Sequence, residues 1–292
     1  MGIKEEIINS FKTGSTLTKL IYINLGLFII VGLGSAILTL FNVSNVWTTI
    51  LMLPSKFSIL ITRPWSILTY MFLHLNFIHL LFNILTFYWF GNLFMQYYSQ
   101  KELVGLYITS GILGGALYML AYSFFPYFAD KYGDLTGASA AVMGIIVAVA
   151  VTAPDRLIRL MFIGDVKLKW IAIVGIIISL LNVASENAGG NISHIGGALG
   201  GYLFVLASRK GKDITAWVNR PINFLANLFN RSPKMKVTYN NNRPMTDQEY
   251  NYNKKQEAEN IDKILDKIKK SGYESLSKEE KRQLFSASGK RK

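Results

Sequence analysis

Long apolar stretches separated by short polar segments fill the first 208 residues. A helix that crosses a bilayer needs roughly 17–25 predominantly apolar residues. Six such spans are predicted, of which the fifth is short: about 20–41, 73–93, 103–125, 135–151, 170–183 and 192–207. The first is too long for the core of a signal peptide and is expected to stay in the protein. The pattern predicts an all-α membrane protein, with a six-span domain over 20–208 after a cytoplasmic segment, 1–19.

The segment between the first two predicted spans, Phe41 to Tyr70, is apolar but interrupted. Pro54 and Pro64 each lack a backbone donor, so this segment is not expected to cross the membrane. Its Trp residues are expected at headgroup depth, which places the loop in the membrane interface.

The chain becomes polar after the last predicted span. Over 209–246, apolar residues recur at helical spacing around Pro221, from Ile214 to Phe229. This pattern predicts an amphipathic helix on the membrane surface, kinked or broken at the proline, and then a polar linker.

Residues 247–292 are expected to form a small, basic, cytoplasmic helical hairpin. Thr246 with Glu249, and Ser277 with Glu280, have the spacing of capping boxes at two helix starts. Ser271-Gly272 supplies the turn between the helices. The apolar stripe of the first helix consists of Ile261, Ile264, Leu265 and Ile268.

The distribution of charge predicts the orientation. From Arg209 onward there are 20 Lys and Arg against 10 Asp and Glu, so the tail carries most of the net charge of +13. The loops on the side of the N-terminus are rich in Lys and Arg, whereas the other side holds only Lys56, Arg63 and Lys131. Both termini are therefore expected in the cytoplasm. A basic tail suits a cytoplasmic partner or anionic lipid, and no nucleic-acid partner is expected.

Cysteine is absent, and the three histidines, His74, His79 and His194, all lie in or beside apolar segments. The absence of cysteine excludes disulfides, thiolate catalysis and cysteine metal sites. Three histidines without cysteine also disfavour a catalytic zinc. Neither a cofactor nor a metal is expected.

Polar side chains inside lipid are costly, so they are functional candidates. His79 and Asn83, four residues apart, share one face of the second span, and Ser139 follows Gly137 at the start of the fourth. His194 opens the sixth span. Each also has an ordinary explanation: His and Asn bond neighbouring helices, and serine bonds back to a carbonyl one turn earlier.

Depth in the membrane brings these groups together. Ser139 and His194 are expected about 5 Å below their helix starts, and His79 and Asn83 about 10–15 Å, all in one layer that faces outside. In its first turn, Ser139 has free backbone N–H groups nearby that suit an oxyanion. A nucleophile, a base and two hydrogen-bonding side chains are what acyl transfer needs.

Two further features refine this hypothesis. Gly197 and Gly201 follow His194 at a spacing of four, which serves helix packing alone or brings His194 to a neighbouring helix. No Asp or Glu lies in a predicted span, the nearest being Asp134 and Glu186 in external loops. A Ser–His dyad is therefore favoured over a carboxylate-assisted triad.

Over roughly residues 15–208 the chain resembles the rhomboid family of intramembrane serine proteases. The motifs that carry the resemblance are His74…His79-Leu-Leu-Phe-Asn83, Gly137-Ala-Ser139 and His194-Ile-Gly-Gly197-Ala-Leu-Gly-Gly201. It implies a serine endopeptidase that hydrolyses peptide bonds in or near transmembrane helices of membrane proteins.

The resemblance also implies roles for single residues. Ser139 would attack the scissile carbonyl, and His194 would take its proton and pass it to the leaving amine. The Ser139 backbone N–H, Asn83 and His79 would bind the oxyanion. Water would enter from the outer face, and the substrate would be a transmembrane helix unwound near its outer end. The expected location is a bacterial inner membrane.

The sequence departs from the family pattern at three places. Ala140 follows the serine where the family usually has glycine, and Met143 replaces an aromatic residue that packs on the histidine. The Trp-Arg pair of the first loop appears as Trp65-Ser66, with Arg63 ahead of it. The main alternative is a non-catalytic rhomboid-like binder of membrane helices. A small transporter is disfavoured, since neither an intramembrane charge nor a discontinuous helix is evident.

Overall fold

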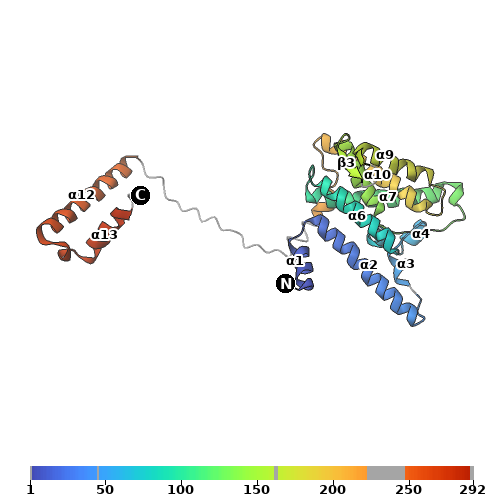
Figure 1. Cartoon of the computed structure of the whole chain (residues 1–292), viewed down its shortest axis with the longest axis horizontal. Coiled ribbons are helices and arrows are strands. Elements are labelled where there is room, and N and C mark those ends of the chain that lie inside the picture. Colours follow the sequence, from blue (N-terminus) through green and yellow to red (C-terminus); the bar gives the residue numbers. More distant parts are fainter. Residues whose placement is uncertain (1, 45, 161–163, 222–246, 290–292) are drawn as a thin grey trace. The chain divides into compact units, whose positions relative to one another are not determined.

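The computed structural model describes residues 2–44, 46–160, 164–221 and 247–289, and most of them are helical. The chain forms two compact units, 1–231 and 232–292 (Figure 1). The helices and 3₁₀ turns of the first unit are α1 (Ile3–Thr13), α2 (Thr16–Leu40), α3 (Val46–Leu51), α4 (Phe57–Leu60), α5 (Ser66–Thr69), η1 (Tyr70–Phe72), α6 (Phe77–Phe94), α7 (Gln100–Phe124), η2 (Pro126–Phe128), α8 (Ser139–Thr152), α9 (Leu168–Leu181) and α10 (Ala188–Arg209).

Three of the described helices are long and apolar enough to cross a membrane: α2, α6 and α7. The apolar helices α8 and α9 are shorter, with 14 residues each. Helix α10 has 22 residues and is rich in glycine. The first unit is thus a bundle of apolar helices, as the hydrophobic pattern predicts for an integral membrane protein.

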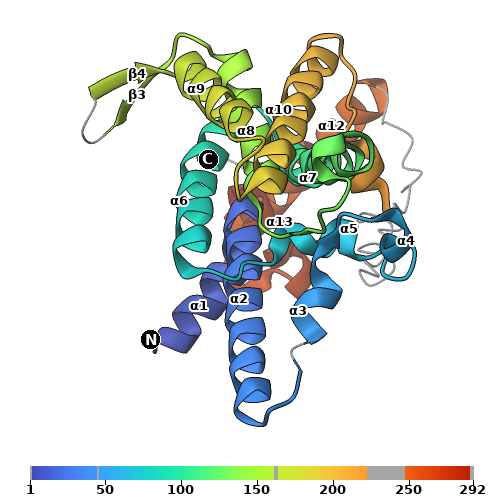
Figure 2. The ribbon, with the colours of Figure 1, turned by 90° about the vertical axis from the view of Figure 1, so that its right-hand side faces the viewer.

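Helix α8 lies at the centre of the bundle, packed against α6, α7, α9 and α10 (Figure 2). Its residues from Ala140 to Ala150 are buried, apart from partly buried Met143. Two glycines of α10 make this packing close: a Cβ on Gly197 or Gly201 would collide with a backbone carbonyl oxygen of α8. Small residues on facing helices allow such an approach, because no large side chain separates the backbones. The close backbones then gain dispersion contacts.

The helices begin and end at other residues than the predicted spans, and three of the differences affect the residues of the predicted site. Helix α6 begins at Phe77, because the Asn76 side chain accepts from the N–H groups of Ile78 and His79 and caps it. Helix α8 begins at Ser139, later than the apolar run suggests. Helix α10 begins earlier, at Ala188, because its first turns are built from small and polar residues that do not read as an apolar span.

These boundaries correct the expected depths. Ser139 is the first residue of α8 and so lies at its start rather than about 5 Å below it. His194 is the seventh residue of α10, about 9 Å from the helix start rather than about 5 Å. His79 is the third residue of α6 and Asn83 the seventh, about 3 and 9 Å from its start, shallower than expected.

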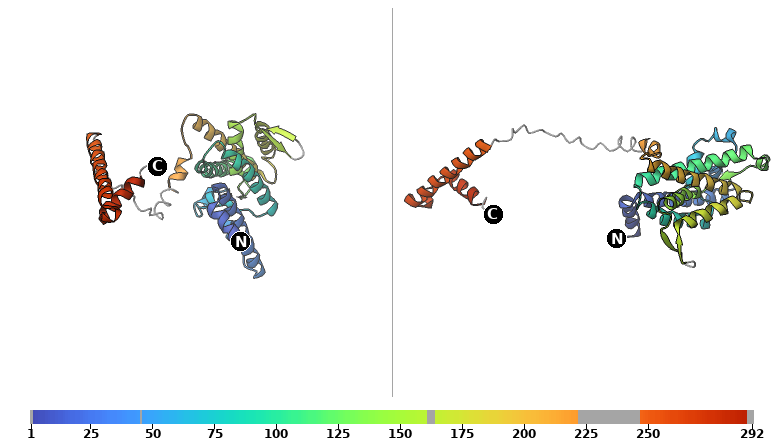
Figure 3. Two further views of the ribbon diagram at one scale, coloured as in Figure 1. Left: turned by 60° about the vertical axis from the view of Figure 1, so that its left-hand side comes forward. Right: turned by 90° about the horizontal axis from the view of Figure 1, so that it is seen from above.

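The loop between α2 and α6 and the loop before α8 are joined by two short strands, β1 (Leu53–Pro54) and β2 (Asp134–Leu135), which pair antiparallel. The first loop is also anchored on α7, since the Tyr70 hydroxyl donates to Gly111 O at 2.6 Å. Another antiparallel pair, β3 (Leu157–Leu160) and β4 (Gly164–Lys167), projects from the bundle between α8 and α9 (Figure 3). The hydrophobic pattern predicts neither this hairpin nor the N-terminal helix α1.

The segment after α10 is described as far as Pro221, and 216–221 is helical. Thr215 and Val218 are buried, and Thr215 packs against Gly105 of α7. Trp217 remains half exposed. This part of the predicted amphipathic helix is thus held against α7, while its continuation beyond Pro221 and the polar linker lie outside the described residues.

The second unit is a helical hairpin of α12 (Asp247–Ser271), a 3₁₀ turn, η3 (Tyr273–Ser275), and α13 (Lys278–Gly289). The Glu280 carboxylate accepts from the Ser277 N–H, and the Ser277 hydroxyl accepts from the Glu280 N–H, which confirms that capping box. Thr246 lies outside the described residues. Within the predicted apolar stripe of α12, Ile264 is buried, Ile261 and Ile268 are partly buried, and Leu265 is half exposed.

Candidate active site

A serine and a histidine from two helices meet near one end of the bundle. Ser139 is the first residue of α8, and its Oγ lies 2.8 Å from Nε2 of His194 on α10. The glycine contacts between α8 and α10 allow this distance, because they bring the two backbones together just beyond His194. Both side chains are partly buried. A hydroxyl hydrogen-bonded to an imidazole is the pair that activates a serine nucleophile.

The turn before Ser139 is fixed by the segment that precedes α6. The Gly137 N–H donates to Tyr70 O at 2.9 Å, and the Ala138 N–H donates to His74 Nε2 at 3.3 Å. His74 is almost completely buried. Sequence reasoning noted His74 only as part of a motif, whereas the structure makes it a support of the nucleophile's turn.

Gly137 has the backbone conformation that this turn requires. Its φ is 111°, which side-chain-bearing residues rarely adopt. A Cβ at this position would lie 2.6 Å from His79 Cε1. The His79 ring therefore lies directly over the backbone that leads to the nucleophile.

Asn83 is buried one turn after His79 on α6. Its Nδ2 donates to His79 O at 2.9 Å, which uses one of its two amide protons. The second proton has no partner in the described part of the chain. The structure thus places His79 against the turn at Gly137. Asn83 lies beside His79, with one amide proton that has no hydrogen-bond partner in the described residues.

Nδ1 of His194, the ring nitrogen that does not face Ser139, lies near a residue that the sequence analysis did not single out. Ser179, on α9, is buried, and its Oγ lies 3.3 Å from His194 Nδ1. Its hydroxyl also donates to Gly175 O at 2.9 Å. In the sequence only the motif residues indicated a function. A single serine within an apolar span does not, because serine is common in membrane helices.

Ala140 and Met143, the two residues of α8 that depart from the family pattern, each pack against a neighbouring helix. The Ala140 methyl is buried and faces α7, since a Cβ on Gly114 would lie 2.6 Å from it. Met143 extends toward α9, where a Cβ on Gly175 would lie 3.2 Å from its terminal methyl. Neither side chain therefore fills the space between Ser139 and His194.

Arg63 links the loop between α2 and α6 to the loop before α8. Its guanidinium donates to Thr49 O and, at 3.0 Å, to the Tyr132 hydroxyl, and it lies 3.5 Å from the Asp134 carboxylate. Burial raises the pKa of Tyr132, and its hydrogen bond to Asp134 raises it further. Asp134 thus serves this link rather than the histidine.

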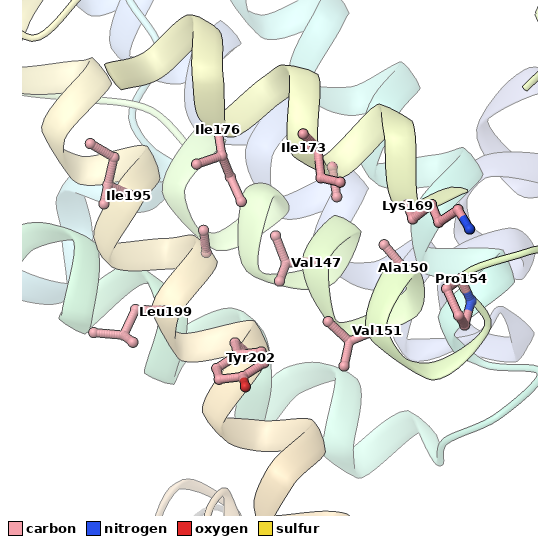
Figure 4. A pocket seen from close by; sticks show the side chains of 12 residues that line it. Val147, Ala150, Val151, Pro154, Lys169, Ile173, Ile176, Ile195, Leu199 and Tyr202 are labelled. Carbon is pink, nitrogen blue, oxygen red and sulfur yellow. The ribbon is translucent and has the colours of Figure 1, made fainter. Parts of the chain in front are cut away.

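Two cavities lie beside the helices that carry the candidate site. One, of about 400 Å³, is polar and is lined by His79, by Thr136 of the nucleophile's turn, by Asp134 and Glu186, and by three tyrosines. The other, of about 500 Å³, is apolar and lies between α8, α9 and α10, from Lys169 at one end to Ile195 at the other (Figure 4). Only the polar cavity could hold water beside the site.

Comparison with known proteins decides the family. The sequence matches the Rhomboid domain over residues 62–210, just over half of the chain and the whole stretch from Arg63 through α10. The chain belongs to the rhomboid family. This confirms the resemblance drawn from the three motifs, and it makes the chain an integral membrane protein of a family that includes serine proteases.

A curated relative and a second match complete the comparison. The rhomboid protein is 29% identical to the rhomboid protease GluP of Bacillus subtilis (strain 168) over 146 residues. That stretch covers 49% of this chain but 26% of GluP, so the chain spans about a quarter of that relative's length. Residues 245–290 match a family of unknown function, DUF6576. The hairpin thus has relatives of its own outside the Rhomboid domain.

Proposed function

We propose that this rhomboid protein is an intramembrane serine endopeptidase that hydrolyses peptide bonds in or near transmembrane helices of other membrane proteins. The observation that carries the proposal is the 2.8 Å distance between Ser139 Oγ and His194 Nε2. Similarity to a rhomboid protease supports it. A non-catalytic binder of helices would have no need for this pair.

In the proposed mechanism His194 removes the Ser139 proton as the hydroxyl oxygen attacks the scissile carbonyl, and then protonates the leaving amine. Ser139 begins α8, so its N–H has no partner within the helix and is available to the oxyanion. Asn83, with one amide proton unused, and His79 supply further donors. Water then hydrolyses the acyl-enzyme with His194 as base.

The polar cavity beside His79 supports a supply of water from the outer face. Its tyrosine and carboxylate groups solvate water, which the apolar cavity does not. An intact substrate helix hides its carbonyls in hydrogen bonds, so the substrate must unwind locally before Ser139 can attack.

The proposed topology has six spans, α2, α6, α7, α8, α9 and α10, with both termini in the cytoplasm of a bacterial inner membrane. The excess of Lys and Arg on one side supports it. The chain has no cysteine, so single cysteines introduced at Lys131 and Lys212 report sidedness without background. Labelling of Lys131→Cys alone by an impermeant maleimide in intact cells is expected, and the reverse pattern would contradict this topology.

The decisive experiment is cleavage of a model single-span substrate by purified protein. Ser139→Ala and His194→Ala are each expected to abolish cleavage, and a fluorophosphonate probe should label wild type but not Ser139→Ala. Ser123→Ala is a matched control, because Ser123 is a helix serine bonded to a carbonyl four residues earlier and away from the dyad. Full cleavage by Ser139→Ala would sink the proposal.

A further inference from the structure

The surroundings of His194 contain a second hydroxyl group, besides that of Ser139, that neither the motifs nor the comparisons assign. Ser179 sits on α9 with 2% of its surface exposed, between Gly175 O and the His194 ring. Its Oγ is 2.9 Å from the carbonyl oxygen and 3.3 Å from Nδ1. Both contacts are made away from bulk water, where a hydrogen bond also fixes orientation.

The number of available protons determines which atom donates and which accepts in each of these hydrogen bonds. A serine hydroxyl has one proton, and a carbonyl oxygen can only accept. The shorter contact, to Gly175 O, takes the Ser179 proton, so the Ser179 oxygen is left to accept from Nδ1–H of His194. A neutral imidazole with its proton on Nδ1 has its lone pair on Nε2. That nitrogen faces Ser139 Oγ at 2.8 Å and accepts its proton.

In the described part of the chain, the hydrogen-bond partners of the His194 ring are Ser139 and Ser179. No carboxylate hydrogen-bonds to His194 within the described residues, and Asp134 is engaged by Arg63. Met143 stands where the family has an aromatic residue that packs on the histidine. Its side chain extends toward Gly175, one turn before Ser179. A hydrogen bond from α9 therefore takes the place of a carboxylate or a packed ring.

We propose that Ser179 is a positioning residue that holds His194 in the Nδ1–H tautomer, with Nε2 ready to accept the Ser139 proton. The effect on kcat that this inference predicts rests on the proposed protease function, whereas the predicted tautomer of His194 does not. The tautomer of His194 exists whether or not a substrate is cut.

The test compares Ser179→Ala with wild type, with Ser123→Ala as the matched control and Ser179→Thr as the variant that keeps the hydroxyl. Loss of one hydrogen bond to the base is expected to lower kcat about tenfold with KM unchanged. Ser179→Thr should recover at least part of this loss, and Ser123→Ala should match wild type.

The second measurement is ¹⁵N NMR of histidine-labelled protein, with the His194 signals assigned by their loss in His194→Ala. Wild type is expected to show Nδ1 protonated and Nε2 unprotonated, and Ser179→Ala a mixture of both tautomers. A merely structural role for Ser179 would not alter this ratio. Unchanged signals in Ser179→Ala would overturn the inference, even if kcat fell.

The two failures can be told apart. If Ser139→Ala still cuts the substrate, the protease proposal is lost, and the ¹⁵N spectra alone decide whether Ser179 sets the tautomer. If wild type cuts but Ser179→Ala cuts equally fast, the positioning role is overturned while the protease proposal stands.

Discussion

The methyl group of Ala140 and the Cα of Gly114 form a matched contact between α8 and α7. A Cβ on Gly114 would lie 2.6 Å from the Ala140 Cβ, closer than two methyl groups can approach. The extra methyl that this chain carries after its candidate nucleophile is thus accommodated by a glycine on the neighbouring helix. It points into packed protein and leaves the space between Ser139 and His194 free.

Ala140→Gly is therefore expected to affect stability more than activity. Removing a buried methyl and placing glycine in a helix together cost about 1–2 kcal/mol. Cleavage per folded molecule should stay within about threefold of wild type. Thermal unfolding in detergent and initial cleavage rates measure the two effects. A tenfold faster Ala140→Gly enzyme would mean that the methyl obstructs the site after all.

Gly137→Ala is expected to abolish most cleavage, because the new Cβ meets the His79 ring and the backbone has a φ of 111°. The matched control is Gly164→Ala in the β3–β4 hairpin, where φ is 90° and no atom lies within 4 Å of the Cβ. Both variants carry backbone strain of about 1–3 kcal/mol, but only the first disturbs the site. Equal cleavage by the two would show that the contact with His79 does not matter.

Asn83→Ala is expected to lower kcat about 100-fold with little change in KM, as removal of one oxyanion donor does. Asn92→Ala is a close control: Asn92 lies on the same helix, and its side chain also donates to the carbonyl four residues earlier. Steady-state kinetics on a model substrate separates the variants. If both lower kcat equally, Asn83 acts through the helix and not on the oxyanion.

Arg63→Ala is expected to destabilise the protein by about 1–3 kcal/mol, because it removes two contacts that join the first loop to the loop before α8, with Tyr132 and Asp134, and one contact within the first loop, with Thr49. Arg159→Ala is the control, since the Arg159–Asp165 pair is largely exposed and should contribute less than about 1 kcal/mol. Thermal unfolding of both variants measures the difference. Similar melting temperatures would show that the buried link adds nothing beyond a surface pair.

The hairpin of α12 and α13 is expected to loosen in acid. The Lys267 ammonium, 2.9 Å from both carboxylate oxygens, lowers the pKa of Glu280, and the Ser277 N–H adds to this effect. A lowered folded-state pKa gives stability that is present above the unfolded pKa and lost as pH falls through the folded one. Amide exchange of α13 in the full chain, corrected for intrinsic rates, should therefore speed up below about pH 4.5.

Glu280→Gln should remove this dependence on pH. Glu274→Gln is its control, because Glu274 is almost fully exposed and lies 3.7 Å from Lys281. Persistence of the acid effect in Glu280→Gln would assign it to another carboxylate.

Much of the helical framework could be predicted from the sequence, but its boundaries could not. Apolar runs reveal the interiors of α2, α6 and α7, because each of these helices is long and strongly apolar with few charged residues. The start of α10 escapes the pattern, because its first turns consist of Gly, Asn and Ser rather than large apolar residues. The cap at Asn76 was not predicted, because the apolar residues before it make the span appear to begin at Leu73.

The sequence by itself determined the helical membrane class, the family and the polar groups that stand out in apolar segments, since each of these depends on local composition or on a short motif. Only the tertiary structure decided which groups meet. Ser179 and His194 are 15 residues apart and on different helices, and Gly114 and Ala140 also join two helices. Such contacts depend on how helices cross, which no periodicity along one chain encodes.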